Sequence, residues 1–201
     1  MMTLSTAAFA PYTRAVNLES TQRDITRLRA RFAREPRDGA LHLAQRLSWY
    51  SQQLALSNEL DASRAAWVEA LDVAGHVLEG QGPSQFERTE LIRIGVGTAR
   101  CMVDAGRPEQ ALEVLAKTEL QYQALAAAAA EPATVLALRG AILTVVAEAQ
   151  RALGDADAAM DTLAEALLEL MAGSAANPLI VRSMMSPPLT SIATLIAQQR
   201  P

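Results

Sequence analysis

The segment Gly154-Asp155-Ala156-Asp157-Ala158-Ala159-Met160, continued by Leu163 and Ala166, decides how this chain folds. When the sequence is laid on itself at an offset of 48 residues, Gly154 aligns with Gly106, and Gly106 aligns with Asn58. Glycine and asparagine tolerate the left-handed backbone conformation that commonly ends a helix. The three positions are therefore predicted to be equivalent turns, each joining two helices.

Four further columns of residues share this register. A small residue lies seven positions before each turn residue, another lies five positions after it, a bulky residue follows at nine and a small one at twelve. The columns are Ser51, Ala99, Ala147; Ser63, Ala111, Ala159; Trp67, Leu115, Leu163; and Ala70, Thr118, Ala166. The spacing places the last three columns on one face of a second helix. We therefore expect three antiparallel helix pairs with small residues where two helices cross closely.

Local signals set the boundaries of these helices. Ser84 and Glu87 form a capping box, and Pro108 suits the first turn of a helix. We expect helices over 18–34, 40–56, 60–79, 86–105, 108–130, 133–153, 156–172, 178–185 and 188–198. We expect one domain over 1–201, organised as an N-terminal arm and helix (1–39), pair one (40–82), pair two (83–131), pair three (132–176) and a C-terminal cap (177–201).

Composition agrees with an all-α chain and excludes several classes of function. Of the 201 residues 50% are hydrophobic and 4% aromatic, and about a fifth are alanine, which favours helix over sheet. The net charge of -4 argues against nucleic-acid and membrane-surface partners, which require a basic face. Only Lys117 among the 18 cationic residues is a lysine, which suggests a bacterial source of high GC content.

Cysteine usage and the termini indicate a cytoplasmic protein. Cys101 is the only cysteine, so no intramolecular disulfide forms, and no cluster of Cys and His offers metal ligands. The segment 1–12 lacks a basic start and is interrupted by Ser5 and Pro11, so no signal peptide is predicted. Charged residues or proline interrupt the apolar stretches, so no membrane segment is predicted, and no cofactor is expected.

The segment from Gly154 to Ala166 resembles the second half of a tetratricopeptide repeat, and Gly106 to Leu115 looks similar. The copy that follows Asn58 is weaker, although Trp67 supplies an aromatic side chain that the family favours. The closing proline of that family is absent and its usual period is shorter, so the helices are expected to be longer. The resemblance covers residues 43–172 and implies a curved α-solenoid with a concave groove for a protein or peptide. A HEAT-like stack is the structural alternative.

The resemblance also implies which side chains line the groove. In each pair three first-helix positions carry over: Gln45, Ser48 and Gln52; Arg93, Val96 and Arg100; and Thr144, Glu148 and Arg151. The three arginines of this set would give the groove a preference for anions. The alternative reading of these positions is an ordinary solvated helix face.

The N-terminal helix carries a second candidate surface. Its basic stripe, defined by helical spacing, consists of Arg23, Arg27, Arg31 and Arg34. An apolar stripe of Ile25, Leu28 and Phe32 is expected to dock on the rest of the chain. An acidic partner, a nucleic-acid phosphate, attraction to the chain's own acidic surface or a plain solvated face would each account for the basic stripe. Nucleic acid is the weakest of these because no aromatic residues are interleaved.

The remaining motifs favour structure over chemistry. Gly95-Val96-Gly97 has two glycines of a dinucleotide-binding turn, but Arg100 takes the third position, so both glycines are predicted to allow close helix packing. Cys101 is predicted to be a buried structural thiol, because no base motif accompanies it. Asp155 and Asp157 are predicted to stabilise a helix start.

These observations predict a non-catalytic adaptor or chaperone-like scaffold that binds a partner segment. A small-molecule-sensing or regulatory domain is the alternative. The apolar residues Leu189, Ile192, Leu195 and Ile196 either cap the chain's own array or pair two copies into a homodimer.

Overall fold

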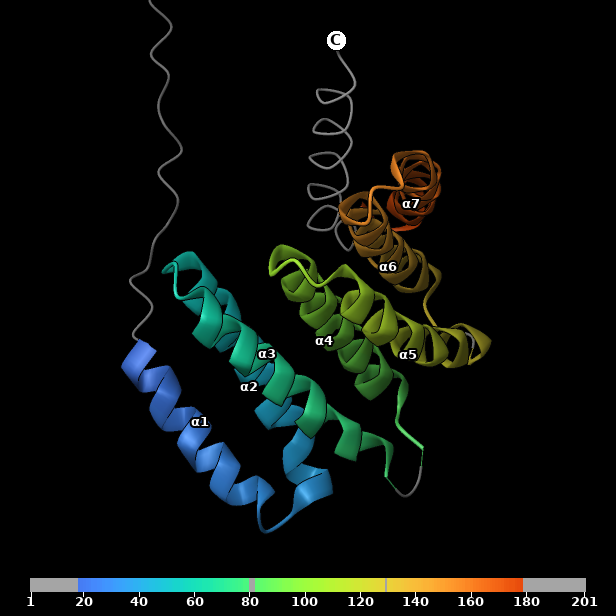
Figure 1. Cartoon of the computed structure of the whole chain (residues 1–201). Helices are drawn as coiled ribbons and strands as arrows, with labels where there is room; N and C mark the ends of the chain where they lie inside the picture. The colour runs from blue at the N-terminus through green and yellow to red at the C-terminus, as the bar shows by residue number, and fades with distance from the viewer. Residues whose placement is uncertain (1–17, 80–81, 129, 179–201) are drawn as a thin grey trace, which may run out of the picture.

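The computed structural model describes residues 18–79, 82–128 and 130–178, and all regular structure within them is helical (Figure 1). The prediction of an all-α chain is confirmed. The elements are α1 (Leu18–Phe32), α2 (Pro36–Leu56), α3 (Leu60–Gly75), a short 3-10 helix η1 (His76–Leu78), α4 (Gln85–Asp104), α5 (Pro108–Ala127), α6 (Pro132–Ala152) and α7 (Ala156–Ala176). The two helices expected over 178–185 and 188–198 lie largely or wholly outside the described residues.

The three predicted turns share one backbone geometry. Asn58, Gly106 and Gly154 have φ angles of 62°, 72° and 90°, which is the left-handed region. In each turn the next residue donates its N–H to a carbonyl five positions earlier, as in the 2.8 Å bond from Glu59 N to Leu54 O. The same six-to-one bond recurs from Arg107 to Met102 at 2.9 Å and from Asp155 to Gln150 at 3.0 Å. This is the Schellman ending, which satisfies the last carbonyls of a helix.

The predicted columns of small and bulky residues are all buried. Every member of the four columns is less than a tenth exposed, and several, including Ala99, Ala111 and Ala159, are fully buried. In the first pair the small residues are also polar, and the Ser51 hydroxyl donates to the carbonyl of Ser63 at 2.7 Å. The register read from the sequence therefore correctly identifies where the helices cross.

The helices pack chiefly as α2 with α3, α4 with α5 and α6 with α7. The first helices of the pairs also meet, because α4 contacts both α2 and α6 (Figure 1). Helix α1 packs on α2 through its apolar stripe, with Ile25 buried and Leu28 and Phe32 partly buried in the same core cluster. The predicted docking of this stripe is confirmed.

Three boundaries differ from the prediction by four residues, and one of them is the end of α7, which continues to Ala176 and not to 172. Helix α2 begins at Pro36 and not at residue 40, because Pro36 suits the first turn and the chain reverses within 33–35. Gly39 permits this tight reversal, since a Cβ at that position would lie 2.8 Å from the Phe32 Cα. Helix α3 ends at Gly75, and the 3-10 turn η1 takes its place over 76–78. The capping box is confirmed, with Glu87 N donating to Ser84 Oγ at 3.2 Å.

Helix α6 is, within the described residues, long and apolar enough to cross a membrane by length and composition alone. More than half of the window concerned is buried inside the protein. The helix packs against α4, α5 and α7, and its interior position accounts for its apolar composition.

Candidate functional site

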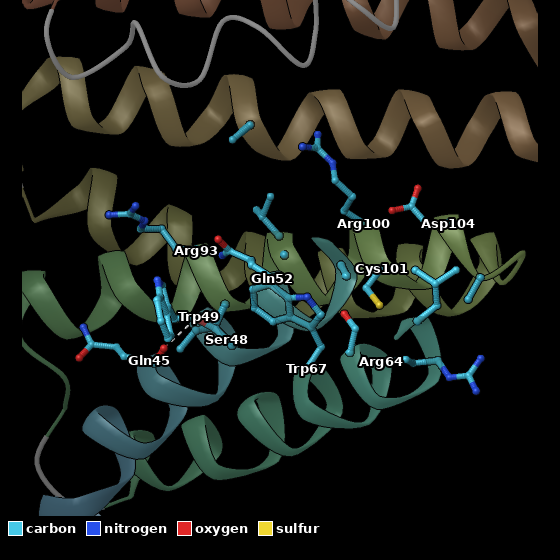
Figure 2. Close-up of a pocket in the computed structure, with 18 of the residues that line it drawn as sticks. Gln45, Ser48, Trp49, Gln52, Arg64, Trp67, Arg93, Arg100, Cys101 and Asp104 are labelled. Carbon is cyan, nitrogen blue, oxygen red and sulfur yellow. Dashed lines mark hydrogen bonds between the residues drawn. The ribbon is translucent and has the colours of Figure 1, made fainter. Parts of the chain in front are cut away.

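A groove of about 800 Å³ lies between α2, α3 and α4, with α6 contributing Leu138 and Ala141 (Figure 2). Along α4 its lining runs from Glu90 to Ala105. At 1.5 Å per residue, this stretch spans about 22 Å. The cavity is therefore elongated, with apolar, neutral polar and charged side chains along one path.

The structure brings six of the nine predicted groove residues into this lining. They are Gln45, Ser48, Gln52, Arg93, Val96 and Arg100. Thr144 is instead buried, and its hydroxyl donates to the Gly140 carbonyl at 2.7 Å, so it presents no surface to a partner. Glu148 of α6 has a largely buried side chain that pairs with Arg100. Arg151 lies in the last turn of α6, away from the lining residues.

Both tryptophans of the chain line the groove, and the sequence reasoning placed neither there. Figure 2 shows the indole of Trp67 near the middle of the groove and Trp49 toward one end. Trp67 packs against Gly97, where an added Cβ would lie 2.3 Å from the ring atom Cη2. Trp49 carries the Arg46 guanidinium 5.0 Å from its ring centroid, a cation–π distance.

Glycines 95 and 97 lie inside helix α4, which contradicts a nucleotide-binding turn. A Cβ on Gly95 would lie 2.1 Å from the Thr118 hydroxyl of α5, just as one on Gly97 would enter the Trp67 ring. The prediction that these glycines allow close helix packing is confirmed. They let α5 and the Trp67 side chain of α3 approach the backbone of α4.

The arginines of the groove face carboxylates. The Arg93 Nη1 atom lies 3.5 Å from Glu90 Oε1, and the Arg100 Nε atom lies 3.2 Å from Glu148 Oε2. Arg64 of α3 pairs with Asp61 at 2.7 Å. The three pairs offset the positive charge of the groove, so the expected preference for anions has no support in the charge balance.

Asp104 stands apart from these pairs at the last position of α4. Its carboxylate makes no ion pair with any cationic side chain of the described ranges. Although Asp104 is an exposed residue, partial desolvation of its carboxyl group and the nearby charge of Glu148 raise its pKa, and the Arg100 guanidinium offsets part of that rise. The groove thus ends in a carboxylate that lacks a cation.

Cys101 also lines the groove and is only half-buried, which corrects the prediction of a buried thiol. Burial is the main cause that raises its pKa, with the negative charge of Asp104 adding to it and Arg64 opposing it. A raised pKa keeps the sulfur in its protonated, weakly nucleophilic form. Within 18–79, 82–128 and 130–178 no three residues among His, Cys, Asp and Glu gather into a metal-binding group.

The basic stripe is solvent-exposed along its length, with Arg23, Arg27 and Arg31 on α1 and Arg34 in the turn that follows it. Two of its members have intrahelical or nearby acidic neighbours, with Arg27 3.9 Å from Asp24 and Arg31 3.7 Å from Glu35. Exposed pairs of this kind contribute little to stability. The stripe fits the reading of a solvated helix face, and the hollow beside Arg23 is lined by α1 residues.

Comparisons of the chain with protein-family models, with curated proteins and with solved structures find no match. The interpretation of the groove therefore depends on its own residues and geometry.

Proposed function

We propose that this chain is a non-catalytic protein–protein interaction module, an adaptor or chaperone-like scaffold, that holds a segment of a partner protein in the groove. The observation that carries the proposal is the shape of the groove. It follows about 22 Å of α4 and alternates apolar with polar lining, which suits a peptide better than a compact metabolite.

The proposal includes a tetratricopeptide-like array of three helix pairs that is curved into a superhelix. It is supported by the three equivalent turns and by the contacts of α4 with α2 and α6, which bring first helices together. In such an array the partner lies across successive first helices. A cytoplasmic location is proposed on the basis of the single unpaired cysteine.

A small-molecule-sensing function is the second candidate, because one observation favours it. The groove volume of about 800 Å³ lies in the range that small-ligand sites occupy, and two indole rings contribute to its lining. An effector held between Trp49 and Trp67 would bridge α2 and α3.

Selection from a library of random displayed peptides tests the first proposal against the second. Gln52→Trp places a bulky ring in the groove, whereas Gln123→Trp makes the same change on the exposed surface of α5. Peptides selected on the unaltered chain should bind the Gln123→Trp variant normally and lose at least tenfold in affinity for Gln52→Trp. Selected peptides that bind both variants equally, or a library without binders, would contradict the adaptor function.

A further inference from the structure

We infer that the groove selects a basic partner segment, in which an apolar side chain lies against the tryptophan-lined part of the groove and a lysine or arginine pairs with Asp104. This inference rests on the proposed function, because it specifies the chemistry of the segment that the groove holds.

The charge balance of the groove supports a cationic partner. Its lining contains three arginines, Arg64, Arg93 and Arg100, and three carboxylates, Asp61, Glu90 and Asp104. Glu148 adds a fourth carboxylate through its contact with Arg100, so the set carries a net charge of -1 (three positive and four negative). The Arg93 side chain is 60% exposed, but an anionic segment that paired with Arg100 would have to displace Glu148. Displacement would leave a largely buried carboxylate without its cation, which is costly.

The position of Asp104 also favours a cation. It ends α4, and the neighbouring lining residues Ala55 and Ala105 lie at the C-terminal ends of α2 and α4. Helix C-termini carry partial negative charge and attract lysine and arginine. Figure 2 shows Asp104 beyond Arg100, at the opposite end of the groove from Trp49. A partner cation at this end meets a carboxylate that no described arginine or lysine neutralises.

The apolar part of the groove lies at a fixed spacing from this carboxylate. Trp67 packs over Gly97, and Val96 lines the groove beside it. Seven helical residues separate Gly97 from Asp104, a rise of about 10 Å. In an extended peptide about 10 Å corresponds to three residues. The preferred motif is therefore an apolar residue and a lysine or arginine three positions away.

The peptides enriched in the library selection test this inference directly. Random peptides of about ten residues are long enough to cross the groove when extended. Groove-dependent peptides, meaning those that Gln52→Trp rejects, should contain more Lys and Arg than Asp and Glu and should place one basic residue three positions from an apolar one. The most enriched of them is then labelled, and its affinity is measured by fluorescence polarisation.

Asp104→Asn should weaken the binding of that peptide about 2- to 5-fold, the range expected for one exposed charge pair. Asp161→Asn, an equivalent change at an exposed position of α7, should leave the affinity unchanged. Replacing the basic residue of the peptide by glutamine should cost the same factor, and the two losses should not add. Groove-dependent peptides without a basic excess, or an unaltered affinity in Asp104→Asn, would overturn the inference while leaving the proposed function intact.

Discussion

The first and third helix pairs have the same register but different chemistry where their helices cross. In pair one Ser51 and Ser63 meet through hydroxyl and carbonyl hydrogen bonds of 2.7 and 2.9 Å. In pair three Ala147 and Ala159 occupy the same positions in a wholly apolar contact. The crossing therefore requires small volume, and it accepts polar groups only where they are hydrogen-bonded to each other.

The bulky residues of the two pairs, Trp67 and Leu163, also differ in the helices that they contact. Leu163 clusters with the small residues of its own pair, whereas Trp67 extends to Gly97 of the next pair. Leu163 thus acts within its own pair, whereas Trp67 also ties pair one to α4, and pair three meets pair two through α6. Substitutions at matched positions of the two pairs test this difference.

Truncation of the bulky residues should have the largest effect. We expect Trp67→Ala to lower the free energy of unfolding by about 4 kcal/mol and Leu163→Ala by about 3 kcal/mol, because both side chains are more than nine-tenths buried. Urea unfolding followed by circular dichroism measures both. A larger loss of unfolding free energy for Leu163→Ala than for Trp67→Ala would show that the contact of Trp67 with α4 contributes little to stability.

A methyl group added at Gly140 should be the next most damaging change. Its Cβ would lie 2.5 Å from Leu170 Cγ, and Leu170 is fully buried, so we expect a net loss of about 1 to 2 kcal/mol. Pair one has Ala44 at the register of Gly140 (140 − 96 = 44) and Ala74 at that of Leu170, so two alanines replace the combination of a glycine and a leucine. Gly75→Ala is the control, since its Cβ meets nothing within 4 Å and should stabilise by about 0.5 kcal/mol.

The serine contact of pair one should respond to single and double replacement differently. Ser51→Ala leaves the Ser63 hydroxyl buried without its partner and should cost about 1 to 2 kcal/mol. The double variant Ser51→Ala, Ser63→Ala recreates the alanine crossing of pair three and should recover most of that loss. Thermal unfolding of the two variants decides this, and a double variant weaker than Ser51→Ala would contradict the equivalence of the crossings.

Substitutions in the turns of the two pairs should change the stability less, and in opposite directions. Gly154→Ala puts a Cβ on a residue with φ of 90° and should destabilise by about 1 kcal/mol through backbone strain alone, because no atom lies within 4 Å. Asn58→Gly relieves a mild strain at φ of 62° and should stabilise by a few tenths of a kcal/mol. Equal effects of the two changes on the melting temperature would argue against a shared turn geometry.

Replacement of Asp104 should give the smallest change in stability. The equivalent position in pair three, 48 residues further on, is Ala152. The pKa of Asp104 is raised in the folded state, so folding favours the protonated carboxyl and stability falls as the pH rises through that raised value. At neutral pH the ionised group is therefore unfavourable, and Asp104→Asn should raise the melting temperature by about 1 °C. The gain should vanish near pH 3, below the usual pKa of aspartate, which is about 3.9. A lower melting temperature of the variant at neutral pH would contradict this assignment.

The backbone plan was readable in the sequence because it depends on local chemistry. Left-handed turn residues, a capping box and small residues in register fix helix ends and crossings by short-range rules. The start of α2 was misplaced because Pro36 reads equally well as the end of a loop and as the first turn of a helix. Only the close approach of Gly39 to Phe32 distinguishes these readings, and that contact depends on tertiary structure.

The groove was predicted less completely, because its chemistry depends on contacts between pairs. Arg100 was expected to attract anions, yet Glu148 lies 48 positions further on and reaches it from the next first helix. Trp67 was assigned to the interior of its pair, since the sequence does not show that Gly97 leaves space for its ring. One signal was available: Gly97 lies in the same register as Trp49 and Val145, and the missing side chain in that column indicates room for an aromatic neighbour.

The placement of both indole rings in the groove has a practical consequence. The chain contains no tryptophan elsewhere, so its tryptophan fluorescence, excited at wavelengths that tyrosine does not absorb, originates entirely from the walls of this one cavity. Trp49 is partly exposed and Trp67 is nearly enclosed, so a ligand that displaces water from Trp49 would shift the emission to shorter wavelength. The protein thus carries its own optical reporter of groove occupancy and can be titrated with any candidate partner that lacks tryptophan without attaching a dye.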